Sequence, residues 1–183
     1  KIFEAVDGAG RLTGLVNNAG VVDLKARVDE MSAARIERMF RINVLGAILC
    51  AREAVKRMST RHGGTGGAIV NLSSAAAVLG APDTFVDYAA AKGAIDSFTV
   101  GLGKEVAAEG IRVTAVRPGL IATDIHADAG AADRVFALED QIPAKRAGTA
   151  DDVARVIVWL LSDGAGYCHG AIVDVSGGRS AVP

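Results

Sequence analysis

Cysteine is scarce in this sequence, aromatic residues are few, and neither sign of charge is in excess. The two cysteines, Cys50 and Cys168, are too few for a disulfide framework, and neither has the spacing of a zinc site. No set of histidine, aspartate and glutamate has ligand spacing either, so we expect no metal site. With 20 lysines and arginines against 21 acidic residues, the net charge of −1 offers no basic surface for nucleic acid and no polybasic anchor for a membrane.

Long apolar runs are also absent. No run approaches the roughly 18 to 20 residues of a membrane span, and no signal peptide is visible. The chain does contain 50% hydrophobic residues and 22 glycines among its 183 residues, with only 4% aromatics. This composition fits one soluble, cytoplasmic α/β domain whose layers are packed from alanine, valine, isoleucine and glycine.

Short apolar segments alternate with helical patterns along the chain. Strands are expected at residues 15–16, 68–70, 113–116 and 171–175. Helices are expected over residues 32 to about 58, over a segment that includes residues 88–106 and ends near residue 110, and over residues 150–162. Strands that alternate with helices indicate a parallel sheet with right-handed crossovers. The predicted fold class is therefore α/β, a doubly wound parallel sheet of the Rossmann-like kind.

Three of the expected strands run directly into polar residues. These are residues 17–20 (Asn-Asn-Ala-Gly), 71–74 (Asn-Leu-Ser-Ser) and 117–119 (Arg-Pro-Gly). Ligands of parallel sheets bind outside the carboxyl ends of the strands, so the three clusters are expected on one rim. Each cluster alone could equally form an ordinary turn. Their coincidence on one rim predicts a ligand site.

Tyr88 and Lys92 are four residues apart on a predicted helix, which puts a phenol and an ammonium one above the other. The same face includes Ile95 and Leu102, so Lys92 is expected to point inward, where an unpaired charge is costly. A cation near a phenol favours the phenolate. We therefore expect Lys92 to lower the pKa of Tyr88 and make it a usable proton donor or acceptor. The alternative is a chance pair whose lysine reaches solvent.

These motifs, in this order, resemble those of the short-chain dehydrogenases/reductases. The matching segments cover nearly the whole chain and are Asn17-Asn18-Ala19-Gly20, Asn43-Val44-Leu45-Gly46, Ser74, Tyr88-Ala89-Ala90-Ala91-Lys92 and Pro118-Gly119-Leu120-Ile121-Ala122-Thr123. The resemblance implies an oxidoreductase that transfers a hydride between NAD or NADP and a small-molecule carbonyl/alcohol substrate.

The resemblance also implies a role for each matching residue. Tyr88 would be the general acid/base, Ser74 would hydrogen-bond the substrate oxygen, and Lys92 would hold the nicotinamide ribose. Asn43 would support a water-linked proton relay to Lys92. The residues implied to border the cofactor are Asn18, Gly20, Tyr88, Lys92, Pro118, Gly119, Ile121 and Thr123. A homodimer or homotetramer, assembled through the helices at residues 35–58 and 89–94, is implied as well.

The sequence departs from the family pattern in two places. Ser74 precedes Tyr88 by 14 residues where many members have 13, which leaves Ser73 as an alternative, although Ser73 is expected to hydrogen-bond locally at the strand end. The chain also starts without the strand, glycine-rich turn and helix that hold the pyrophosphate, so the choice between NAD and NADP stays open. We expect residues 1–183 to form a single Rossmann-like domain that is incomplete at its amino end, with about 60 residues, or two βαβ units, absent.

Residues 120–146 lose clear periodicity and are the expected substrate lid, with His126 as a candidate substrate contact. No charged cluster is visible there, which suggests a neutral or weakly polar substrate. Asp87 is expected to be a helix-start or surface carboxylate. Two other functions stay open. One is a non-catalytic relative that serves as a regulatory or oligomer subunit, and the other is a nucleotide-sugar epimerase with the same tyrosine/lysine chemistry.

Overall fold

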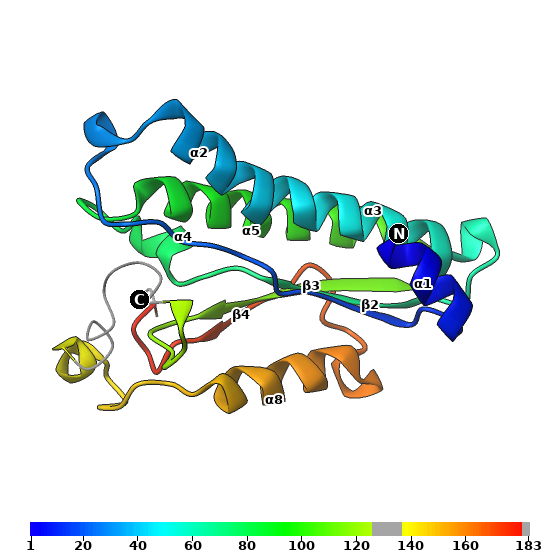
Figure 1. The fold of residues 1–183 in the computed structure, drawn as a ribbon. Helices are drawn as coiled ribbons and strands as arrows, with labels where there is room; N and C mark the ends of the chain where they lie inside the picture. The colour runs from blue at the N-terminus through cyan, green and yellow to red at the C-terminus, as the bar shows by residue number, and fades with distance from the viewer. Residues whose placement is uncertain (126–136, 181–183) are drawn as a thin grey trace.

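The computed structural model describes residues 1–125 and 137–180, and a parallel sheet forms its centre (Figure 1). The strands follow one another across the sheet in the order β1 (Gly14–Asn17), β2 (Gly67–Leu72), β3 (Ile111–Pro118) and β4 (Ile172–Val175). Their register aligns the carboxyl ends, since Asn17 lies opposite Asn71 and Pro118 opposite Val175. The predicted parallel α/β sheet is therefore confirmed.

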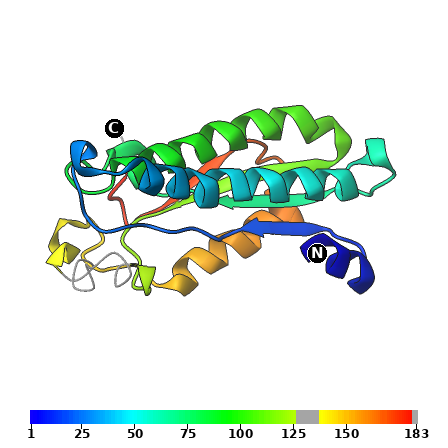
Figure 2. The same ribbon diagram turned by 45° about the horizontal axis from the view of Figure 1, so that its top comes forward.

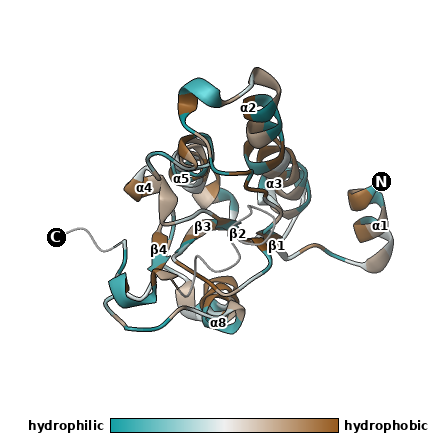
Figure 3. Cartoon of the chain, turned by 60° about the vertical axis from the view of Figure 1, so that its left-hand side comes forward, coloured by the Kyte–Doolittle hydropathy of each residue, from teal (hydrophilic) through white to brown (hydrophobic). Residues whose placement is uncertain are grey.

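Helices cover both faces of this sheet (Figures 1 and 3). One face is covered by α2 (Ala33–Phe40), α3 (Gly46–Met58) and α5 (Val86–Val106), and the other by α8 (Ala150–Leu161). The shorter elements are α1 (Ile2–Ala9), α4 (Ala76–Leu79) and the helical turns Val28–Glu30, Thr60–His62, Ala107–Glu109, Glu139–Gln141 and Asp163–Ala165. In the part of the chain so described, no helix is long and apolar enough to cross a membrane.

Residues 33–58 are helical without a break, as expected for residues 32 to about 58, and they lie alongside α5 (Figure 2). Ser32 caps the start of this helical segment, because the Ser32 side chain accepts a hydrogen bond from the backbone N–H of Arg35. Its middle differs from the prediction. A π-helical segment, Arg41–Leu45, separates α2 from α3 and contains the buried Asn43. Such widened turns occur frequently at functional sites.

The last crossover has the opposite hand to the first two. The chain moves across the sheet in one direction from β1 to β4, yet α3 and α5 lie above the strands whereas α8 lies below them (Figure 3). The expectation of right-handed crossovers is therefore wrong for the β3-to-β4 connection. The packing of α8 explains the exception, since Val153 and Leu160 are buried against Val70 and Val116 on the face away from α5.

Two apolar clusters, one on each face of the sheet, form the core. They follow from strand geometry, because consecutive side chains of a strand point to opposite faces. Ile69 accordingly packs with Ala51, Ala54, Met58 and Val113 under α3 and α5, whereas Val70 packs in the α8 cluster. Full burial of each large aliphatic side chain contributes about 1.5 to 3 kcal/mol. The small alanines of α3 let that helix approach the sheet closely.

Candidate active site

A cavity of about 800 Å³ lies at the carboxyl ends of the strands. The predicted site residues that line it are Asn18, Gly20, Ser74, Tyr88, Lys92, Pro118, Gly119, Ile121 and Thr123. They come from the segments after β1, β2 and β3 and from the first turns of α5, so the predicted common rim is confirmed. Of the predicted site residues, Asn43 is the one that does not line the cavity.

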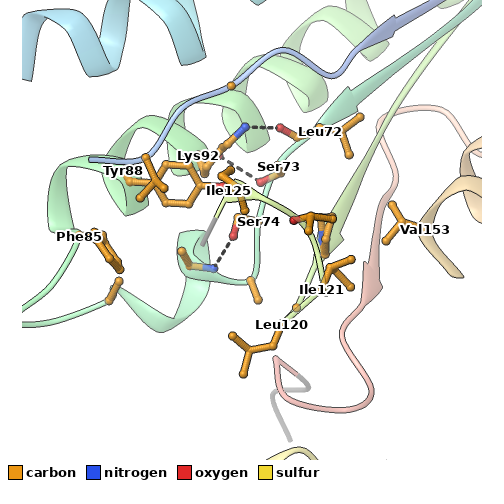
Figure 4. A pocket seen from close by; sticks show the side chains of 18 of the residues that line it. Leu72, Ser73, Ser74, Phe85, Tyr88, Lys92, Leu120, Ile121, Ile125 and Val153 are labelled. Carbon is orange, nitrogen blue, oxygen red and sulfur yellow. Dashed lines mark hydrogen bonds between the residues drawn. The ribbon is translucent and has the colours of Figure 1, made fainter. Parts of the chain in front are cut away.

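Tyr88 and Lys92 lie next to each other on α5, as their spacing predicts (Figure 4). The ammonium nitrogen of Lys92 is 5.6 Å from the centre of the Tyr88 ring. Lys92 does not reach solvent, since its side chain is buried and its Nζ donates a 2.7 Å hydrogen bond to the carbonyl oxygen of Leu72 at the end of β2. The alternative of a solvent-exposed lysine is therefore wrong.

Burial is the main cause of the pKa shifts of both Tyr88 and Lys92. It lowers the pKa of the Lys92 ammonium to about 8, and the nearby Asp96 carboxylate opposes that shift. Burial also raises the pKa of the Tyr88 phenol, while a hydrogen bond with Ser74 acts in the lowering direction. The prediction that Lys92 lowers the phenol's pKa is wrong for this structure. The reason is that the cation lies 5.6 Å from the ring centre and is bonded to a carbonyl, whereas loss of water around the phenolate acts directly.

Ser73 and Ser74 occupy different environments. Ser74 hydrogen-bonds with Tyr88 and lines the cavity, and its Oγ also accepts a bond from the backbone N–H of Ala76. The buried Ser73 instead donates from Oγ to the backbone carbonyl of Lys92 at 3.2 Å. Both serines are drawn in Figure 4. The geometry favours Ser74 as the partner of a substrate oxygen and gives Ser73 the local bond that was expected.

Asn43 holds the segment after β1 against Lys92. Its Nδ2 donates to the carbonyl oxygens of Val21 at 2.9 Å and Met39 at 3.0 Å, and its Oδ1 accepts from the Val21 N–H at 3.1 Å. A Cβ on Gly20 would lie 2.8 Å from Asn43 Oδ1 and 3.4 Å from Lys92 Nζ. Glycine is therefore required at position 20 by close approach. The water-linked relay through Asn43 stays a prediction.

A chain of buried amides beneath the site was not predicted. Asn17 Nδ2 donates to Asn71 Oδ1 at 2.8 Å, and Asn71 Nδ2 donates to Thr99 Oγ1 at 2.9 Å. Asn71 and Thr99 are fully buried, so these bonds satisfy polar groups that would otherwise be costly. They tie the ends of β1 and β2 to α5. The sequence shows that an asparagine, Asn71, lies at the end of an apolar strand. It does not show that Thr99 on the helix is the hydrogen-bond partner of Asn71.

Asp87 is at the start of α5, as expected, but it is not a surface residue. It is 6% exposed and forms an ion pair with Arg35. Its Oδ1 also accepts a 2.9 Å hydrogen bond from the backbone N–H of Tyr88. The interpretation of Asp87 as a surface carboxylate is wrong because α2 supplies a cation from 52 residues away.

The segment that follows β3 is anchored to two neighbours. The Gly119 N–H bonds to the Val175 carbonyl, and a Cβ on Gly119 would lie 2.8 Å from the Cα of Ser176. Residues 120–122 pair with Gly148 through reciprocal backbone bonds. The expected lid is therefore fixed at its start. His126 lies outside the described residues.

The residues present fit a nicotinamide cofactor. Gly20 and Gly119 line the rim with backbone atoms only, because a Cβ at either position would lie 2.8 Å from a protein atom, and Asn18 and Thr123 supply polar groups along it. Lys92 donates one ammonium hydrogen bond, to the Leu72 carbonyl oxygen, and lines the same cavity. An ammonium has three donors, so Lys92 can bind hydroxyl groups as well.

Known proteins match the chain along most of its length. The family model described as enoyl-(acyl carrier protein) reductase matches residues 1–180. The chain is 52% identical to the uncharacterized oxidoreductase YgfF of Escherichia coli, over 97% of this chain and 72% of that protein. It is 39% identical to a glucose and ribitol dehydrogenase homolog of Oryza sativa, over 97% of this chain and 61% of that protein.

Solved structures agree with the sequence matches. The structure of ElxO with NADP bound superposes with a TM-score of 0.86 at 30% identity, covering 97% of this chain and 71% of ElxO. The chain therefore belongs to the short-chain dehydrogenases/reductases. It is an NAD(P)-dependent oxidoreductase of that family, with a Rossmann-like fold.

Proposed function

We propose that this protein transfers a hydride between NAD(P) and a carbonyl/alcohol substrate, with Tyr88 as the general acid/base. The observation that supports this most is the convergence of Tyr88, Ser74 and Lys92 on one cavity. The raised pKa of Tyr88 keeps its phenol protonated at neutral pH, so it can donate a proton to the oxygen of a carbonyl that is being reduced. In the reverse direction the phenolate accepts the proton of the alcohol.

Each neighbouring residue has a distinct part in this proposal. Ser74, which hydrogen-bonds with Tyr88, binds the same substrate oxygen and orients it. Lys92 binds the ribose hydroxyls of the cofactor, and Asn43 fixes the loop beside Lys92. The nicotinamide supplies the hydride acceptor or donor when the cofactor is bound. The residues proposed to border the cofactor are Asn18, Gly20, Tyr88, Lys92, Pro118, Gly119, Ile121 and Thr123.

The two alternative functions are less well supported. A non-catalytic subunit gives no reason to retain a buried lysine beside a tyrosine and a serine in an open cavity. A nucleotide-sugar epimerase would use the same tyrosine, and the family match to reductases and dehydrogenases favours net oxidoreduction.

We also propose that the protein works in the cytoplasm as a homodimer or homotetramer. Leu45 and Leu49 are one helical turn apart and are 49% and 40% exposed beside α5. Exposed apolar pairs of this kind usually mark an interface. Sedimentation of a Leu49→Glu variant should give a lower mass than wild type, while Tyr167→Glu, at a fully exposed position after α8, should leave the mass unchanged. Equal masses for wild type and Leu49→Glu would contradict this interface.

Turnover by the complete polypeptide tests the proposed function. Alcohols and ketones are supplied with NAD(H) and with NADP(H), and the reduced nicotinamide is followed by absorbance. We expect reversible oxidoreduction with one or both cofactors. Binding of the cofactor without any oxidation or reduction across the panel would favour the non-catalytic alternative.

A further inference from the structure

Arg179 differs from the other arginines of the described residues in having a partly buried guanidinium without a partner among those same residues. It follows β4 and lines the same cavity as Tyr88 and Ser74. No hydrogen bond or ion pair joins its side chain to residues 1–125 or 137–180. Arg41 likewise has no side-chain partner in this part of the chain, but Arg41 is exposed to solvent. Burial alone lowers the pKa of Arg179, which reflects lost hydration without a compensating carboxylate.

The backbone around Arg179 is held firmly. The Arg179 N–H bonds to the Ser176 carbonyl, and the Ser180 hydroxyl donates to Asp174 Oδ1 at 2.8 Å and shares a second 2.8 Å hydrogen bond with the Ser176 hydroxyl. Gly177 and Gly178 have φ angles of +62° and +89°, a left-handed conformation that glycine adopts without strain. The turn therefore fixes the direction in which the side chain of Arg179 leaves the sheet.

The acidic residue of β4, Asp174, is already occupied. Asp174 accepts the Ser180 hydroxyl and lies 3.9 Å from Arg117, which is itself bonded to Asp96. The described residues that line the cavity include two cations, Lys92 and Arg179, and no aspartate or glutamate. A desolvated cation without a counter-charge is costly, so an anionic ligand would be bound favourably there.

We propose that Arg179 binds a carboxylate or phosphate of the substrate, so that the substrates are oxo acids and hydroxy acids or their phosphate analogues. This inference rests on the proposed function. It replaces the expectation of a neutral substrate, which considered only residues 120–146. Arg179 follows β4, whereas Asn18 and Gly20 follow β1 at the other edge, three strand spacings or roughly 14 Å away. Gly119, which is also proposed to border the cofactor, lies closer, against Ser176 on the Arg179 turn, so the experiment below separates an anion of the substrate from one of the cofactor.

Binding experiments on the complete polypeptide can test this without turnover. The probes are oxo acids of three to eight carbons, whose carbonyl lies at increasing distance from the carboxylate, each paired with its methyl ester. Calorimetry is done on Tyr88→Phe protein saturated with oxidised or reduced cofactor. We expect one chain length at which the acid binds at least tenfold more tightly than its ester. Arg179→Gln should reduce that ratio to about one, and Arg179→Lys should restore part of it.

Matched variants separate the competing explanations. Arg61→Gln removes the same charge from an exposed position far from the cavity and should leave the acid-to-ester ratio unchanged. The inference is wrong if no acid binds better than its ester, or if Arg179→Gln weakens acid and ester equally. It is also wrong if Arg179→Gln weakens NAD(P)H binding tenfold and leaves the ratio unchanged, since the anion would then be the cofactor's. Failure of the proposed function has a different signature, namely full turnover by Tyr88→Phe.

Discussion

Arg35 and Asp87 form a partly buried, bidentate ion pair directly before Tyr88. Arg35 Nε lies 2.8 Å from Asp87 Oδ2, and its second guanidinium nitrogen donates to Oδ1 at 3.3 Å. Arg35 also donates to the Leu24 carbonyl at 2.6 Å. The pair joins α2, the segment after β1 and the first turn of α5. It therefore positions the backbone of Tyr88, whose N–H bonds to the same carboxylate.

Loss of one partner of this pair should be destabilising. Asp87→Ala leaves the partly buried Arg35 guanidinium without its counter-charge, and we expect a loss of about 1.5 to 3 kcal/mol in the free energy of unfolding. Urea unfolding measures it. Asp151→Ala is the control, because it breaks an exposed ion pair with Arg155 and should change stability little. Similar small losses in both variants would show that the buried pair has no special structural role.

The stability of the protein should depend on Lys92 at alkaline pH. Its pKa in the folded protein is about 8, below the ordinary value of 10.5, so the folded state releases this proton before the unfolded state does. Between pH 8 and about 10 the unfolded state binds more protons, and stability contributed by this group rises with pH. Relative to Lys92→Met, the free energy of unfolding of the wild type should rise by roughly 1 kcal/mol for each pH unit in this window.

Urea unfolding of both proteins at pH 7, 8, 9 and 10 measures that difference. Below pH 8 the two curves should run parallel, since Lys92 is protonated in both the folded and the unfolded state. A difference between the proteins that stays constant from pH 7 to pH 10 would mean that Lys92 is not desolvated as its buried position indicates.

Gly20 should be intolerant of a side chain. In Gly20→Ala the new Cβ would meet Asn43 Oδ1 at 2.8 Å, and the bonds that fix Asn43 prevent it from moving away. We expect the loop beside Lys92 to shift and NAD(P)H affinity, measured by fluorescence titration, to fall at least tenfold. Gly101→Ala is the control. A Cβ there meets nothing within 4 Å, so affinity should be retained and stability should rise by about 0.5 to 1 kcal/mol. Wild-type affinity in Gly20→Ala would contradict the proposed fit.

Local patterns in the sequence were sufficient for the features that depend on local geometry. Alternating apolar runs and polar clusters located the strands and their common rim, and the spacing of Tyr88 and Lys92 placed both on one helix face. Features set by partners distant in sequence could not be predicted this way. The Arg35–Asp87 pair joins residues 52 positions apart, and the pKa of Tyr88 depends on burial by several elements.

The π-helical turn at Asn43 and the reversed last crossover were missed for related reasons. One extra residue in a helical turn hardly changes the apolar periodicity of residues 32–58, so it leaves no clear signal. The hand of the last crossover depends on which face α8 covers. That choice is made by packing against Val70 and Val116 rather than by the sequence of the helix alone.

Turnover of a Tyr88→Phe variant tests the central claim most directly. The substitution keeps the ring and removes only the hydroxyl that would transfer the proton. We expect kcat to fall by about 10² to 10⁴, the usual contribution of a general acid/base, while the dissociation constant for NAD(P)H stays close to that of the wild type. Wild-type kcat in Tyr88→Phe would contradict the assignment of Tyr88 as the proton donor and acceptor.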